Sequence, residues 1–210
     1  MITNEEEARA YVASLSDPSC KSRLDTLCTA LIEENSRQNL ISRPSEGQIW
    51  QRHVADSAQL LRFVPRETSG AWLDLGTGAG FPGLVIAAIR TDLPVFLVES
   101  RARRVEWLAH AAAQMGLANV TVLGKRLELV EPFQVSVISA RAFAPLPKLL
   151  RLSSPFSTKA TVYVLPKGRS AAQELSDLPK ASRKMFHVEQ SLTDSEAGII
   201  VGGGAQETSR

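Results

Sequence analysis

Hydrophobic positions in the first third of the chain recur at the spacing of amphipathic helices. One apolar stripe follows the pattern i, i+3, i+4, i+7 and i+8 through Leu24, Leu27, Cys28, Leu31 and Ile32. Asp17-Pro18 precedes this stripe and suits an N-cap followed by proline in the first turn. A second helix is expected from Ser45 through Leu61, with Pro65 ending it. We therefore predict an N-terminal helical cap over residues 1–66.

After Gly70 the pattern changes to short apolar runs that alternate with helical stretches. The pattern predicts strands at 71–75, 94–99, 119–123, 134–139 and 160–165, and helices at 83–90 and 101–115. This alternation predicts an α/β fold over residues 67–204, a Rossmann-like, mostly parallel sheet with helices on both faces. Segments 184–191 and 197–202 are expected to pair antiparallel at the sheet edge. Gly202, Gly203 and Gly204 are expected to fray together with a flexible tail at 205–210.

Composition agrees with a globular protein that carries no membrane anchor. At 210 residues, 44% of them hydrophobic and 22% charged, the chain suits one α/β domain with a short appendage. No run approaches the roughly 18 apolar residues that a membrane span needs. The acidic start, Glu5-Glu6-Glu7, does not resemble a signal peptide, so we expect a cytoplasmic protein. Cys20 and Cys28 lie in a helical pattern, which predicts ordinary thiols and no metal site.

Charge is distributed unevenly along the chain. Residues 101–184 hold 14 Lys or Arg and 5 Asp or Glu, a net charge of +9, although the whole chain carries only +2. The segments on either side are net acidic. Self-repulsion of this size favours a polyanionic partner such as a nucleic acid. The alternative is plain surface solubility, with the acidic segments folded against the basic one.

The segment DLGTGAGFPG at residues 74–83 carries the clearest chemical signal. It follows the predicted strand at 71–75 and opens the predicted helix at 83–90, which is the setting of a nucleotide-binding glycine loop. Glycines at this point permit positive φ angles and a close approach of the backbone to a ligand. We also expect the start of the helix to present unpaired N–H groups to that ligand.

The spacing of the glycines favours one cofactor. A dinucleotide fingerprint is G-x-G-x-x-G, whereas here the third glycine comes one residue early and Phe81 follows it. Asp74 offers a carboxylate that suits an ammonium or a sulfonium, and S-adenosylmethionine carries both. Glu99 ends the next predicted strand, where an acceptor for ribose hydroxyls belongs. We therefore predict S-adenosylmethionine as the cofactor, with Asp74, Thr77, Gly78, Gly80 and Glu99 at its binding site.

The histidines give a weaker signal. His53 lies three residues before Asp56, so both side chains can share one side of the second predicted helix. A structural hydrogen bond is the simpler interpretation, and catalysis is the alternative. His110 and His187 have no evident partner, and no Ser-His-Asp or Cys-His arrangement stands out.

Several short segments occur together over about residues 35–170. In chain order they are Asn39-Leu40, His53-Val54-Ala55-Asp56-Ser57, the glycine segment at 74–83, Glu99-Ser100, Arg103-Arg104, Trp107-Leu108, Ser139-Ala140-Arg141-Ala142-Phe143-Ala144 and Lys167-Gly168. The combination resembles the small-subunit ribosomal RNA methyltransferase G family, also called glucose-inhibited division protein B. The glycine loop alone would indicate only a class I S-adenosylmethionine-dependent methyltransferase.

The resemblance implies methylation of N7 of a guanine in a loop of 16S ribosomal RNA near the decoding centre. It also implies cofactor contacts at Gly76 and Phe81, at the Leu127-Glu128 pair and at Arg141. The chain departs from the family pattern at Arg103, where lysine is usual, and at the C-terminal end, which lacks the usual basic finish.

The chemistry that the resemblance implies needs few catalytic groups. Guanine N7 has a free lone pair and can attack a sulfonium methyl group without losing a proton, so we expect no general base. Holding the reactants in orientation would supply the catalysis, and Arg141 would orient cofactor or RNA without touching the reacting nitrogen. Basic residues that follow strand ends would bind RNA phosphates. They are Arg103, Arg104, Lys125, Arg126, Lys167 and Arg169.

Other functions remain open at this point. A small-molecule methyltransferase on the same fold would explain the glycine loop but leave the basic segment unused. A cofactor-sensing RNA-binding protein would differ by the absence of methyl transfer. A nicotinamide-dependent oxidoreductase is disfavoured by the glycine spacing and by Phe81. We expect a monomer whose partner is small-subunit ribosomal RNA or the 30S particle.

Overall fold

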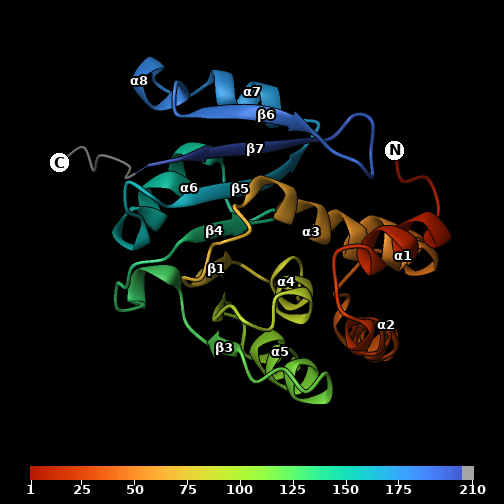
Figure 1. The fold of residues 1–210 in the computed structure, drawn as a ribbon. Coiled ribbons are helices and arrows are strands. Elements are labelled where there is room, and N and C mark those ends of the chain that lie inside the picture. Colours follow the sequence, from red (N-terminus) through yellow and green to blue (C-terminus); the bar gives the residue numbers. More distant parts are fainter. Residues whose placement is uncertain (205–210) are drawn as a thin grey trace.

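The computed structural model describes residues 1–204 and forms a seven-stranded sheet with helices on both faces (Figure 1). In sheet order the strands are β3 (Val120–Leu123), β2 (Val95–Val98), β1 (Trp72–Leu75), β4 (Val137–Ala140), β5 (Val162–Gly168), β7 (Gly198–Gly203) and β6 (Phe186–Gln190). The strands from β3 to β5 are parallel, and β7 runs antiparallel to both β5 and β6. The predicted α/β fold is therefore confirmed, with β4 and β5 both shifted a few residues towards the C-terminus.

Side chains along each strand alternate between two hydrophobic layers, because successive residues of a strand point to opposite faces. Trp72 belongs to the layer that contains α4 (Gly83–Ile89) and α5 (Ala102–Gln114), which were predicted. Leu73 and Leu75 belong to the layer that contains α6 (Leu146–Ser153) and the start of α7 (Ala171–Ser176). Both faces are buried, so these strands contain continuous apolar runs.

The N-terminal helices pack on the α4–α5 side of the sheet (Figure 1). Helix α2 (Pro18–Gln38) begins as predicted, because the Asp17 carboxylate accepts hydrogen bonds from the backbone N–H groups of Ser19 and Cys20. Helix α1 (Glu5–Ala13) precedes it and is capped by Asn4. The cap and the sheet share one hydrophobic cluster, and the division at residue 66 stays a prediction.

The second predicted helix is correct in extent and wrong in type. Residues 43–63 form a 3₁₀ helix (Arg43–Gln48), a π-helix (Trp50–Ala55), one α-helical turn, α3 (Asp56–Ala58), and a second 3₁₀ helix (Gln59–Phe63). These helix types bury the same apolar stripe, so the hydrophobic pattern does not separate them. π-Helical turns concentrate at functional sites, and this one carries His53 and leads directly into Asp56.

The C-terminal part contains the predicted antiparallel pair, β6 and β7, after the short helix α8 (Lys180–Arg183). The expectation that Gly202 and Gly203 fray is wrong, since both belong to β7 and pair with β5, and Gly202 also pairs with β6. A side chain at Gly202 would collide with Phe186, so the strand requires a glycine there. The predicted tail at 205–210 lies outside the described residues. Within residues 1–204, no helix has the length and apolar content to cross a membrane.

Candidate functional site

The glycine loop that links β1 to α4 has the predicted backbone. Gly76, Gly78 and Gly80 have φ angles of +66°, +60° and +109°. Residues with a side chain rarely adopt these angles, so the loop depends on its glycines. The N–H groups of Gly76 and Thr77 both donate to the Val98 carbonyl, at 2.9 and 3.2 Å, and tie the loop to the end of β2.

Asp74 lies beneath this loop and is fully buried. Its carboxylate accepts hydrogen bonds from the Ser139 hydroxyl at 2.7 Å and from the Gly83 N–H at 3.1 Å. Burial raises the pKa of Asp74 to about 6, against the opposing effect of these hydrogen bonds. The expectation of unpaired N–H groups at the start of α4 is therefore wrong, because the chain's own Asp74 and the Gly80 carbonyl satisfy Gly83 and Leu84.

One cavity, of about 370 Å³, opens beside the loop at the ends of β1, β2 and β3, and we call it the glycine-loop cavity. Its volume is within the range of small-molecule sites. Of the residues predicted to bind a cofactor, it is lined by Gly76, Glu99, Leu127 and Glu128. Its cationic lining residues are Arg101, Arg104, Lys125, Arg126 and Lys148.

Glu99 is fixed at the end of β2 with its carboxylate at this cavity. Its Oε1 accepts hydrogen bonds from the backbone N–H groups of Ser100 and Arg101, at 2.7 and 2.9 Å. Its Oε2 lies 3.9 Å from Nη1 of Arg104, and the residue is only 7% exposed. A carboxylate held in this way can accept hydrogen bonds from the hydroxyls of a ribose.

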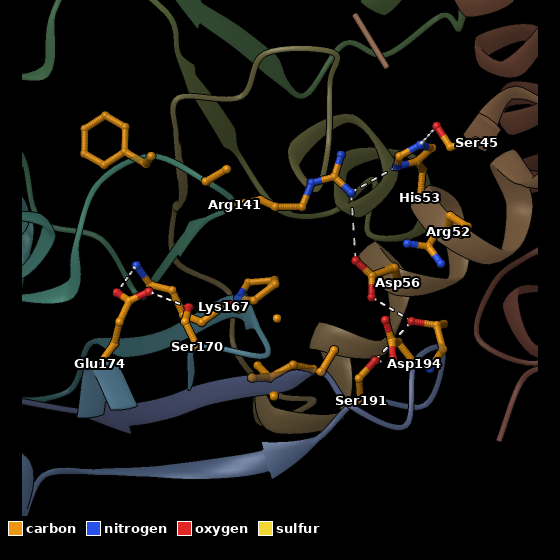
Figure 2. Close-up of a pocket in the computed structure, with 18 of the residues that line it drawn as sticks. Ser45, Arg52, His53, Asp56, Arg141, Lys167, Ser170, Glu174, Ser191 and Asp194 are labelled. Carbon is orange, nitrogen blue, oxygen red and sulfur yellow. Dashed lines mark hydrogen bonds and ion pairs between the residues drawn. The ribbon is translucent and has the colours of Figure 1, made fainter. Parts of the chain in front are cut away.

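A second cavity, of about 980 Å³, lies between the cap and the sheet (Figure 2), and we call it the cap cavity. Its walls come from the cap, from the loop between β4 and α6, from the end of β5 with α7, and from the β6–β7 loop. The residues that carry its polar chemistry include Ser45, Arg52, His53, Asp56, Arg141, Lys167, Glu174, Thr193 and Asp194. Residues 142–144 line both cavities, so this short segment forms their shared wall.

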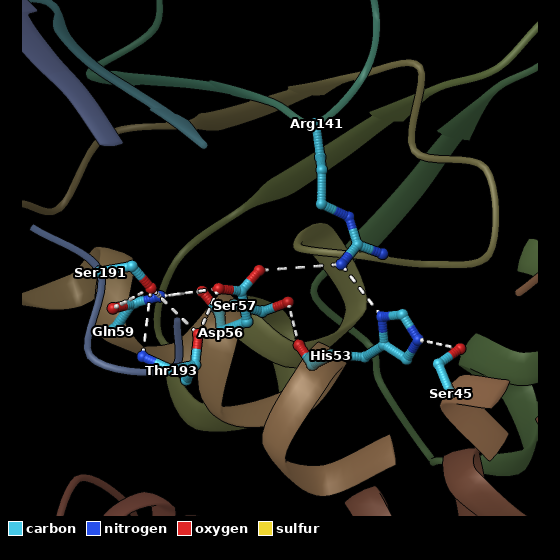
Figure 3. A network of polar contacts seen from close by, with 8 residues as sticks. All are labelled: Ser45, His53, Asp56, Ser57, Gln59, Arg141, Ser191 and Thr193. Carbon is cyan, nitrogen blue, oxygen red and sulfur yellow. Dashed lines mark hydrogen bonds and ion pairs between the residues drawn. The ribbon is translucent and has the colours of Figure 1, made fainter. Parts of the chain in front are cut away.

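Arg141 joins the end of β4 to the cap (Figure 3). Its Nη1 lies 3.1 Å from Nδ1 of His53 and 3.8 Å from Oδ2 of Asp56. Because a guanidinium can only donate, Nδ1 of His53 accepts, and Nε2–H donates to the Ser45 hydroxyl at 3.0 Å. Burial, together with the Arg141 charge, lowers the pKa of His53 to about 3, so the ring is neutral. His53 and Asp56 thus share a partner, as expected if both side chains lie on one side of the helix.

Phe81 packs against His53 and Arg141 and so connects the glycine loop to two residues of the cap cavity. The His53 ring stacks on Phe81 with a centroid distance of 5.0 Å, and the Arg141 guanidinium lies 5.2 Å from the same ring centroid. Burial raises the pKa of Asp56, while the Arg141 charge acts in the opposite direction. Arg141 is therefore held by a neutral acceptor, a carboxylate and an aromatic face.

The loop between β4 and α6 is fastened at its far end as well. Nζ of Lys167 donates to the Ala144 carbonyl at 2.7 Å and pairs with Glu174 at 2.9 Å. Glu174 in turn accepts the Leu146 N–H at 2.9 Å. Between these fixed points Ala142 has a φ of +53°, a strained conformation for a residue with a side chain. The shared wall is thus held in place by polar contacts on both sides.

The remaining predicted site residues, Lys167 apart, lie outside the two linings. The buried side of the glycine loop holds five of them and lines neither cavity. They are Asp74, Thr77, Gly78, Gly80 and Phe81. Arg103 is exposed on α5, and Arg169 forms a surface ion pair with Glu196. The Lys167 side chain is 6% exposed, so its ammonium serves the protein's own loop.

Sequence reasoning missed most of the cap cavity. Ser45, Arg52, Thr193 and Asp194 line it and were not predicted. The His53–Asp56 spacing was the one signal within the cap. Nothing local connects the β6–β7 loop to the cap, because the hydrogen bond between Gln59 and Ser191 spans 132 positions.

Comparison with known proteins is consistent with this geometry. The family described as rRNA small subunit methyltransferase G matches residues 21–199. The protein named Ribosomal RNA small subunit methyltransferase G from Erythrobacter litoralis is 59% identical, covering 99% of this chain and all of its own length. The protein of the same name from Novosphingobium aromaticivorans is 55% identical, covering 96% of this chain and 89% of its own length.

Solved structures show the fold at low sequence identity. A SAM-dependent methyltransferase from Aquifex aeolicus has a TM-score of 0.56 at 14% identity, with 76% of this chain and 93% of that chain covered. A variant of MtNAS in complex with S-adenosylmethionine has a TM-score of 0.54 at 13% identity, with 95% of this chain and 77% of that chain covered. The sheet and its helices are therefore those of the S-adenosylmethionine-dependent methyltransferase fold.

Proposed function

Since the chain belongs to the rRNA small subunit methyltransferase G family, we propose that it transfers a methyl group from S-adenosylmethionine to N7 of a guanine in small-subunit ribosomal RNA. The target is a loop of the 16S RNA near the decoding centre. The observation that carries this proposal is the pair of cavities that meet at residues 142–144. One suits a nucleoside cofactor, and the other is large enough for a base.

The glycine-loop cavity fits the cofactor. Glu99 accepts hydrogen bonds from the ribose hydroxyls, and Leu127 and Glu128 flank the adenine end. Gly76 supplies a wall without a side chain, since an added Cβ would lie 2.7 Å from Cδ2 of Phe143. When bound, S-adenosylmethionine supplies a methyl group on a positively charged sulfur that leaves as a neutral thioether. Asp74, Thr77, Gly78, Gly80 and Phe81 support this wall from behind.

The cap cavity receives the acceptor base. Guanine N7 needs no deprotonation, and His53 has both ring nitrogens engaged with Arg141 and Ser45, so it is not a free base. The chain's contribution is orientation, which can be worth roughly 7–11 kcal/mol in favourable cases. Arg141, fixed over Phe81, orients the cofactor and the RNA at the shared wall.

Cationic side chains around the two openings support an RNA substrate. Arg52 lies at the cap cavity, and Arg101, Arg104, Lys125, Arg126 and Lys148 line the glycine-loop cavity. Arg103 is exposed on α5, and Arg169 lies between Gly168 and Ser170, which line the cap cavity. Phosphates of an RNA loop would be held by such groups. Lys167 supports the site from inside the protein. We further propose that the chain acts as a monomer in the cytoplasm.

Label transfer tests the function directly. The protein is incubated with methyl-labelled S-adenosylmethionine and with either naked 16S RNA or 30S particles from cells that lack this enzyme. We expect label in 7-methylguanosine at one position of the RNA, and loss of label with Glu99→Ala but not with Glu106→Ala, an exposed glutamate on α5. Label on a small molecule alone would favour the small-molecule methyltransferase. RNA binding without any label would favour the non-catalytic alternative.

A further inference from the structure

Asp56 has one carboxylate oxygen engaged by the protein and one turned to the cap cavity. Oδ1 accepts hydrogen bonds from Nε2 of Gln59 at 2.8 Å and from the Thr193 hydroxyl at 2.7 Å (Figure 3). Within residues 1–204, no hydrogen bond reaches Oδ2, which lies 3.8 Å from Nη1 of Arg141. The side chain is 21% exposed and lines the cavity. Its position is therefore fixed through Oδ1, while Oδ2 keeps its capacity to accept.

The shape of the cavity limits how a base can lie in it. Figure 2 shows Asp56 on the side opposite Lys167 and Glu174. Lys167 holds the Ala144 carbonyl of the shared wall, so Asp56 faces that wall across the cavity. A guanine whose N7 meets the shared wall turns the 2-amino end of its Watson–Crick edge away from that wall. That edge carries the N1–H and the exocyclic 2-amino group, both of which are hydrogen-bond donors.

We propose that Asp56 determines base specificity, with Oδ2 accepting a hydrogen bond from the Watson–Crick edge of the acceptor guanine. This inference rests on the proposed function. Adenine in the same orientation presents an unprotonated N1 and a C–H to the carboxylate, so it offers no donor. Enzymes that act on an extruded base read it by such edge contacts. The carboxylate also lies near a ring that becomes positively charged when N7 is methylated, and it favours that charge.

The contacts around Asp56 explain why Oδ2 stays free to accept a hydrogen bond from a base and does not bind Arg141 directly. Arg141 is held by His53 at 3.1 Å and so stays outside hydrogen-bond distance of Oδ2. Gln59 is itself anchored to the β6–β7 loop, because its Oε1 accepts the Leu192 N–H at 2.7 Å. The cap and the β6–β7 loop together hold Oδ2 open to the cavity.

Nucleotide binding tests the proposal without relying on turnover. The full chain, with S-adenosylhomocysteine present, is titrated with GMP and with AMP by calorimetry or ligand-observed NMR. We expect the wild type to prefer GMP by about tenfold or more, and Asp56→Asn to lose most of that preference. Asp177→Asn is the matched control: it makes the same change of charge at an exposed residue outside both cavity linings, so the preference should persist.

Three results would overturn the proposal. They are equal affinity of the wild type for GMP and AMP, including no binding of either at millimolar concentration; a wild-type preference retained in Asp56→Asn; and an equal loss of preference in Asp177→Asn. The first comparison needs no variant, so it holds even if Asp56→Asn does not fold. Label transfer to guanine of ribosomal RNA alongside any of these results would overturn the role of Asp56 alone. Absence of label would overturn the proposed function.

Discussion

Nη1 of Arg141 donates to Nδ1 of His53 across 88 positions of sequence, at a distance of 3.1 Å. This contact ties the end of β4 to the π-helical turn of the cap, directly beside the shared wall of the two cavities. It requires a neutral imidazole, because a protonated ring would present a second positive charge to the guanidinium. The structure of the site is therefore coupled to the protonation state of one histidine.

We expect His53 to reduce stability on acidification. Its pKa is about 3 in the folded chain, against an ordinary value of 6.5, so the unfolded chain binds more protons between these two values. The stability that His53 contributes is complete above pH 6.5 and is lost as the pH falls towards 3, by at most about 1.4 kcal/mol per pH unit. The contribution of Asp74 to stability depends on pH in the opposite direction. Because its pKa is raised to about 6 in the folded chain, this contribution is complete below pH 3.8 and is lost as the pH rises through 6.

Comparison with a variant separates these two effects. His53→Gln removes the titrating ring, so the free energy of unfolding of the wild type relative to this variant should fall by roughly 2 kcal/mol between pH 7 and pH 5. Urea unfolding at several pH values measures it. A difference that stayed constant over this range would contradict the neutral, buried imidazole.

Alanine substitutions at two glycines with the same φ angle distinguish backbone strain from a steric clash of the added side chain. Gly76 and Gly116 both have φ +66°, but an added Cβ would meet Cδ2 of Phe143 at 2.7 Å from Gly76 and nothing within 4 Å from Gly116. We expect both alanine substitutions to cost about 1–2 kcal/mol of stability. Only Gly76→Ala should also weaken binding of S-adenosylmethionine, by tenfold or more, because Phe143 must move. Calorimetric titration measures the affinity, and equal affinities of the two variants would argue against Gly76 as a cavity wall.

The buried relay beneath the glycine loop should be costly to break. The Trp72 indole N–H donates to the Ser139 hydroxyl at 2.8 Å, and that hydroxyl donates to Asp74 at 2.7 Å. Ser139→Ala leaves a buried donor and a buried acceptor unpaired, so we expect a loss of about 1–3 kcal/mol in the free energy of unfolding. The exposed Ser195→Ala is the control and should change stability by less than about 0.5 kcal/mol. Equal effects in urea unfolding would show that the relay contributes little.

The sheet could be predicted because its signals are local. Each parallel strand is a short buried apolar run between helical stretches, and the glycine loop is one continuous segment at 74–83. Glu99 was found for the same reason, since a strand end can be recognised without tertiary contacts. The helix type at 43–63 could not be predicted, because 3₁₀, α and π turns differ in hydrogen-bond register and not in apolar pattern.

The cap cavity depends on contacts between distant segments, and these leave no local trace. Asp56 meets Thr193 across 137 positions, and residue types alone do not indicate this pairing. Lys167 shows the converse limitation. Its sequence setting suggested an exposed cation for RNA, yet burial against Glu174 and the Ala144 carbonyl makes it a support of the β4–α6 loop. The charge of a residue suggests that it binds RNA, but its burial in the folded chain determines which groups it contacts.

The cationic lining of the glycine-loop cavity makes RNA affinity depend on salt. Each phosphate neutralised by Lys or Arg releases counterions, so the logarithm of the affinity should fall linearly with the logarithm of salt concentration, by about 0.7 per contact for single-stranded RNA. Replacing Lys125 and Arg126 by glutamine should reduce this slope by about 1–2. The matched control replaces Lys180 and Lys184, at and beside α8, which Figure 1 places at the far end of β6 from the cap. Filter binding of 16S RNA fragments measures the slope. A flat wild-type response would argue against phosphate contacts, and an equal effect of both double variants would place the RNA on another surface.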